Sequence, residues 1–122
     1  MLLRVVVAIE PRSYRQVIGR ALQALRPHLE VVVLDPDTLE AGVARMEPHL
    51  VFADRPNAFA PQGGPVGSPV RVEFRPYEMP PPARVCLAGR RWELEEVELS
   101  DLFTIVDQTE ELSWARRDLG NC

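Results

Sequence analysis

Apolar, β-branched runs alternate with amphipathic helix patterns through the first half of the chain, and this alternation limits the fold more than any other feature. Residues 3–9 form an apolar run interrupted only by one arginine, which is typical of a central strand with both faces buried. Further short apolar runs lie at residues 31–34 and 50–53. The order strand, helix, strand, helix, strand predicts right-handed crossovers and a parallel sheet with helices on its faces.

Two helices are predicted between these strands. In the first, apolar residues recur with the spacing of one helix face, which we expect to contact the sheet; they are Tyr14, Val17, Ile18, Ala21, Leu22 and Leu25. Arg15 is placed on the opposite, solvent-facing side. Pro11 suits the first turn of this helix and Pro27 ends it. The second helix is predicted over residues 38–47, with Asp37 in position to cap it.

The second half of the chain is organised differently. Residues 55–69 are rich in proline and glycine and predict a long loop, which in a compact domain is often functional. The remaining predicted elements are a strand over 70–74, a second loop over 76–83, a β-hairpin over 84–94, a helix over 100–111 and a frayed tail over 115–122. The hairpin contains Trp92 and is expected to expose a sheet edge, which suggests a homodimer.

Composition argues against several classes of function. All 14 basic residues are arginine, and with 18 acidic residues the net charge is 14 − 18 = −4. Neither nucleic acid nor a membrane surface is therefore an expected partner. No signal-peptide pattern or membrane-spanning run is present, which predicts a cytoplasmic location. Cys86 is expected to be a buried thiol, and His28 and His49 are expected to be turn residues rather than metal ligands.

Two segments resemble a known family. The segments Val5-Val-Val-Ala-Ile-Glu-Pro11 and Pro48-His-Leu-Val-Phe-Ala-Asp54 are similar to the first and third strands of bacterial response-regulator receiver domains. In receivers the last aspartate accepts a phosphoryl group, so the resemblance identifies Asp54 as the equivalent residue. It covers residues 3–56 and implies one flavodoxin-like domain over residues 1–122. That domain would be a three-layer α/β fold with a mostly parallel sheet of order 2-1-3-4-5, in which proline- and glycine-rich loops replace the third and fourth helices.

The groups that receivers use beside the phosphoacceptor are missing. Ala8 and Ile9 occupy the positions of the two acids that bind Mg²⁺ in that family, and the sequence contains no lysine to pair with the phosphate. Phe74 and Arg75 stand where receivers have a serine or threonine. A carboxylate without a cation is a poor acceptor, because nothing stabilises the charge on the transferred group. We therefore expect a non-catalytic pseudo-receiver that binds a protein or itself, with no metal or cofactor.

Two alternatives place a site at the same edge of the sheet. Glu10, Asp35 and Asp54 each follow a predicted strand, and Arg55 and Arg75 lie near the same edge. These five side chains would line a pocket for a small molecule beneath the loop of residues 55–69. If two of the carboxylates lay within reach of each other, the same cleft would suit an orphan hydrolase.

Overall fold

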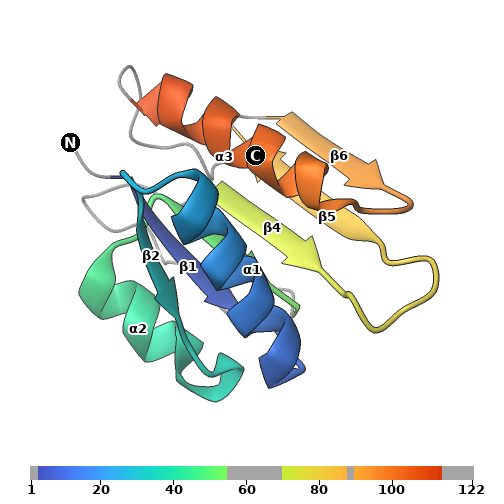
Figure 1. The fold of residues 1–122 in the computed structure, drawn as a ribbon, viewed down its shortest axis with the longest axis horizontal. Coiled ribbons are helices and arrows are strands. Elements are labelled where there is room, and N and C mark those ends of the chain that lie inside the picture. The colour runs from blue at the N-terminus through green and yellow to red at the C-terminus, as the bar shows by residue number, and fades with distance from the viewer. Residues whose placement is uncertain (1–2, 55–69, 88–89, 114–122) are drawn as a thin grey trace.

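The described residues form one six-stranded sheet with three α-helices (Figure 1). The computed structural model describes residues 3–54, 70–87 and 90–113. In chain order the elements are β1 (Arg4–Ala8), α1 (Arg12–Leu25), β2 (Glu30–Val33), a 3-10 turn (Pro36–Thr38), α2 (Leu39–Met46), β3 (Leu50–Ala53), β4 (Val70–Phe74), β5 (Ala83–Leu87), β6 (Arg90–Leu94) and α3 (Leu99–Ser113). The predicted α/β class is confirmed.

The sheet is mixed, with strand order β2-β1-β3-β4-β5-β6. Strands β1 to β4 are parallel to one another, whereas β5 runs antiparallel to β4 and β6 antiparallel to β5. Only residues 75–82 connect β4 to β5, and no helix is assigned within them. A parallel connection requires a crossover of a dozen or more residues, so this short segment returns the chain in the opposite direction. The predicted loop over 76–83 is present, but its last residue begins β5.

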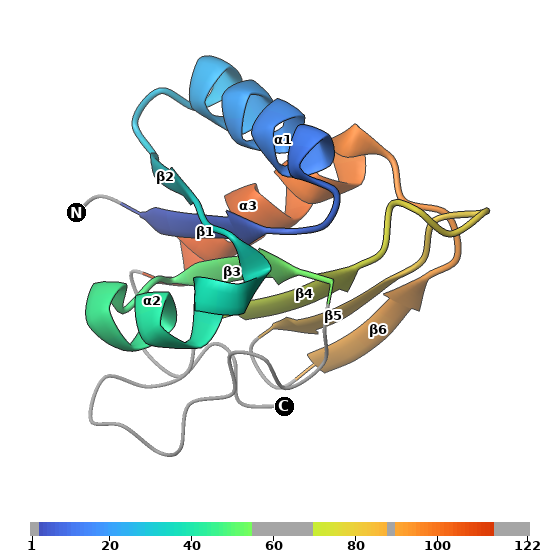
Figure 2. The ribbon, with the colours of Figure 1, turned by 90° about the horizontal axis from the view of Figure 1, so that it is seen from below.

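The helices cover both faces of the sheet. Figure 2 shows α1 and α2 on opposite sides of the strands. The larger core joins α1 and α3 to one face and includes Leu22, Phe52 and Val106, all fully buried. The smaller core packs Leu39 and Val43 of α2 against the other face. This two-sided burial explains why β1 and β3 are continuous apolar runs.

Helix α1 contacts the sheet through only part of the predicted face: Ile18 and Leu22 are buried as predicted, but the helix is rotated toward Arg15 and Gly19. Its buried residues are Arg15, Ile18, Gly19 and Leu22, whereas Tyr14, Val17 and Leu25 are 45%, 62% and 59% exposed. The rotated helix lies close to β2. A Cβ atom on Gly19 would lie 2.6 Å from Cγ2 of Val33, so a larger residue here would require the Val33 side chain to shift. The prediction of Arg15 on the solvent face is therefore wrong.

Two further predictions about local chemistry are corrected. Asp35, not Asp37, provides the cap, because its Oδ1 accepts a hydrogen bond of 2.9 Å from the backbone N–H of Asp37 and closes the 3-10 turn that leads into α2. Cys86 is buried as expected, but it is disulfide-bonded rather than a thiol. Cys122, the other cysteine of the sequence, lies outside the described residues. Among the described helices, none has the length and apolarity needed to cross a membrane.

His49 lies directly before β3 and is hydrogen-bonded to β1. This hydrogen bond makes the free energy of unfolding depend on pH. Its Nδ1 accepts a hydrogen bond of 2.9 Å from the backbone N–H of Arg4, which requires a neutral ring. Burial, and then the charge of Arg4, lower the pKa of His49 below the usual 6.5. Just below pH 6.5, His49 takes up a proton in the unfolded chain but stays neutral in the folded chain, so protonation favours unfolding.

We therefore expect the free energy of unfolding to fall as the pH decreases below about 6.5, by at most about 1.4 kcal/mol per pH unit for this one group. Urea unfolding at neutral and mildly acidic pH measures the effect. In a His49→Gln variant, the difference between the two pH values should be smaller. An equal difference in both proteins would show that other groups cause the pH dependence.

Candidate functional site at the carboxyl end of the parallel strands

The carboxyl ends of the parallel strands bring three acidic residues to one edge of the sheet. Glu10 lies two residues after β1, Asp35 two residues after β2, and Asp54 directly after β3. These strands are neighbours and run in the same direction, so the residues that follow them share an edge. This is the edge at which open α/β sheets bind ligands.

Asp54 is held inside this edge rather than presented to solvent. Its residue is only 6% exposed. Its Oδ2 accepts a hydrogen bond of 3.2 Å from the backbone N–H of Glu10. The strand that carries Asp54 is buried along its whole length, so the position of the carboxylate is fixed by the core beneath it.

A guanidinium group lies beside the other two acids. Arg15, in the first turns of α1, is 8% exposed. Its Nη1 lies 3.8 Å from Oε2 of Glu10, and its Nη2 lies 3.9 Å from Oδ2 of Asp35. Nη1 also lies 3.5 Å from the carbonyl oxygen of Ile9, within donating distance. One guanidinium thus lies beside the carboxylates of Glu10 and Asp35 and offsets part of their combined negative charge.

Sequence reasoning missed Arg15 because the apolar spacing of α1 assigned it to the solvent face. The helix is rotated so that the aliphatic part of Arg15 is buried and its charged end reaches the sheet edge. Long cationic side chains often behave in this way. The sequence did offer one signal, the proximity of two opposite charges. Glu10 lies just before the start of the helix and Arg15 lies in its first turn, five positions later.

The arrangement does not suit a divalent cation. Mg²⁺ requires several oxygen ligands around one point. In the part of the chain that the structure describes, no group of three or more His, Cys, Asp or Glu residues is placed to hold a metal ion. A positive guanidinium group beside Glu10 and Asp35 opposes a second cation there. The described residues therefore do not fit the metal that receivers use.

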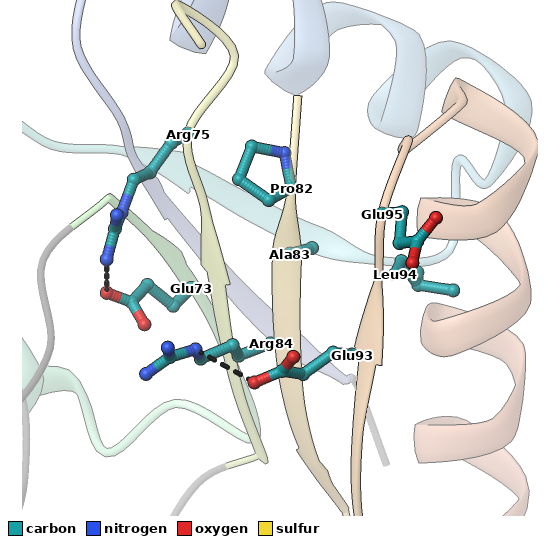
Figure 3. Close-up of a pocket in the computed structure, with 8 residues that line it drawn as sticks. All are labelled: Glu73, Arg75, Pro82, Ala83, Arg84, Glu93, Leu94 and Glu95. Carbon is teal, nitrogen blue, oxygen red and sulfur yellow. Dashed lines mark hydrogen bonds and ion pairs between the residues drawn. The ribbon is translucent and has the colours of Figure 1, made fainter. Parts of the chain in front are cut away.

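Arg75 belongs to a different cluster from the one predicted. It follows β4 at the same sheet edge, but its Nη2 donates to Oε1 of Glu73 at 2.8 Å (Figure 3). Its Nη1 donates to Oε2 of Glu78 at 3.3 Å. These hydrogen bonds, that to Glu73 first, raise the pKa of Arg75. Arg75 and Glu73 line a cavity of about 180 Å³ over β4, β5 and β6, where Arg84 and Glu93 form a second ion pair at 3.2 Å. Arg55 lies outside the described residues.

A larger groove lies between β6 and α3. Its volume is about 480 Å³, and both apolar and polar side chains line it. Leu87, Trp92 and Leu94 contribute from the hairpin, and Ile105 and Leu112 from α3. The guanidinium carbon of Arg90 lies 5.8 Å from the centre of the Trp92 ring. This groove is on the α3 face of the sheet and contains none of the acidic residues at the carboxyl end of β1 to β3.

The three predicted carboxylates therefore lie at one edge, with a buried arginine that was not predicted. Comparisons of the chain with protein-family models, with curated proteins and with solved structures each find no match.

Proposed function

We propose that the chain is a non-catalytic, receiver-like module that acts by binding protein. One observation carries this proposal: the guanidinium of Arg15 lies between Glu10 and Asp35, at the edge where receivers bind Mg²⁺. An arginine supplies positive charge but, unlike a metal ion, it cannot hold a phosphoryl oxygen and the carboxylate of Asp54 together in one coordination sphere. Asp54 is therefore proposed to be a structural carboxylate rather than a phosphoacceptor.

The exposed face of α1 supports binding to protein. Tyr14, Val17 and Leu25 form an apolar stripe, each at least 45% exposed. Their spacing places them on one side of the helix, away from the side that contacts the sheet. A grouped set of exposed apolar side chains is typical of an interaction surface.

The proposal predicts no response to a phosphoryl mimic. Mg²⁺ and beryllofluoride are added to the protein, and the amide shifts of Glu10, Asp35 and Asp54 are followed by NMR. We expect no saturable change at these residues, because the described carboxylates do not surround a metal position.

Saturable shifts centred on Asp54 would overturn the proposal and identify a working switch. An Asp54→Asn variant is the matched control, because it removes the only group that could coordinate beryllium at this position. Shifts that persist in Asp54→Asn would be non-specific. A phosphodonor such as acetyl phosphate, with detection by intact mass, tests the same point independently.

A further inference from the structure

The outer edge of β6 can accept another strand. Among the described strands, β6 has one neighbour, β5, and it stands at the end of the sheet (Figure 1). An edge strand presents backbone N–H and C=O groups that a second chain can pair with. β6 has five residues, a usual strand length, and contains no proline that would block pairing.

The side chains of β6 alternate between two surroundings. Arg90, Trp92 and Leu94 line the groove beneath α3. Arg91 and Glu93 lie on the opposite face, because successive side chains of a strand alternate. Both are exposed, and Glu93 forms its ion pair with Arg84 there. A strand that pairs with β6 would therefore meet opposite charges on one face and a tryptophan on the other.

We propose that the occupant of this edge is β6 of a second copy of the chain, antiparallel, with the two-fold axis at Trp92. A two-fold axis through an antiparallel pair places one residue opposite its own copy. An axis at Arg91 would set two arginines against each other, and an axis at Glu93 would set two glutamates against each other. With the axis at Trp92, each Arg91 lies opposite Glu93 of the second copy, so the pair contains two favourable charge contacts.

The groove beneath α3 fits the same axis. A two-fold axis perpendicular to the sheet keeps both α3 helices on one face, so the two grooves meet at the interface. Directly opposite side chains of an antiparallel pair are about 4.5–5.5 Å apart at Cβ, which brings each Trp92 against the other. Tryptophan is enriched at the centre of protein interfaces. Arg90 would lie opposite Leu94 of the second copy. In that copy Leu94 and Asp101 line the same groove, so Arg90 would approach an acidic residue there.

The other sheet edge lacks this complementarity. In β2 the charged residue is Glu30, which is paired with Arg4 of the same chain at 3.0 Å, and the rest of the strand is valine. Nothing in such a strand selects one register over another. The inference goes beyond the proposed function and does not depend on it, because β6 is separated from Asp54 by the width of β4 and β5.

Charge reversal with complementation tests the proposed pairing. Sedimentation velocity is measured from about 1 µM to about 1 mM for the natural chain, Arg91→Glu, Glu93→Arg and their equimolar mixture. Each single reversal creates two like-charged pairs, so we expect the dimer dissociation constant to rise at least about tenfold. In the mixture, the Arg91→Glu strand has acidic residues at positions 91 and 93, and the Glu93→Arg strand has arginine at both positions. A heterodimer of the two variants should therefore form with the affinity of the natural pair.

Two controls separate this result from a change in folding. Arg20→Glu, an exposed reversal on α1, should leave the dissociation constant unchanged. Circular dichroism should show all variants folded, because the Arg84–Glu93 pair lost in Glu93→Arg is exposed and contributes little to stability. The proposal is overturned if the natural chain stays monomeric throughout. It is equally overturned if the reversals leave the dimer intact, or if the mixture does not recover it.

Discussion

Replacing Phe52 by alanine is expected to reduce the free energy of unfolding by about 3–5 kcal/mol. The ring is fully buried in β3, and its cross-strand neighbours Val7 and Val72 are buried on the same face. The loss combines the transfer free energy of the ring with the cost of a cavity, because β1 and β4 hold the surrounding side chains in place. Domains of this kind have a total stability of about 5–15 kcal/mol, so a large fraction would be lost.

Equilibrium unfolding in urea, followed by circular dichroism, measures this effect. Phe103→Ala is the matched control, since it makes the same chemical change at a partly buried position where the ring contacts Arg26. We expect the control to lose about 1 kcal/mol. Similar losses in both variants would contradict the placement of Phe52 at the centre of the larger core.

Replacing Arg15 by methionine is expected to destabilise the fold by about 1–2 kcal/mol at neutral pH. Methionine retains much of the buried aliphatic volume but removes the charge beside Glu10 and Asp35. Those carboxylates are about half exposed, at 45% and 53%, so water compensates part of the loss.

Arg20→Met on the exposed side of the same helix is the control, with an expected change within about 0.5 kcal/mol. The difference between the two variants should shrink at high salt, because ion pairs with exposed partners are screened. If Arg15→Met were as stable as Arg20→Met at low salt, the guanidinium of Arg15 would not be stabilising the carboxylates at the sheet edge. Asp54 would then have to be treated again as a candidate phosphoryl acceptor.

The strands could be predicted from the sequence because their signal is local. Residues 50–53 and 70–74 were predicted with the bounds that the structure shows, and the other strands were correct to within two residues. Buried β-branched runs between helix-ending prolines leave few alternatives. The three acidic residues at the sheet edge followed from the same reasoning, since parallel strands must end at one edge.

The sheet was predicted to be mostly parallel, without a direction for each strand. The antiparallel direction of β5 follows from the connection over residues 75–82, which is too short for a crossover. The rotation of α1, in contrast, required tertiary information. The helix face was predicted from apolar spacing alone. In the fold, Gly19 packs closely against Val33 of β2, and Tyr14 and Leu25 stay exposed.

The amino-acid sequence by itself determined the order of strands and helices, the position of Asp54 at the end of a buried strand, and the absence of lysine. Only the tertiary structure decided which cation lies beside the carboxylates of Glu10 and Asp35, and which face of α1 contacts the sheet. The physical reason is the range of the interactions. Strand and helix patterns depend on neighbours within a few residues, whereas helix rotation and strand pairing depend on contacts between segments far apart in the chain.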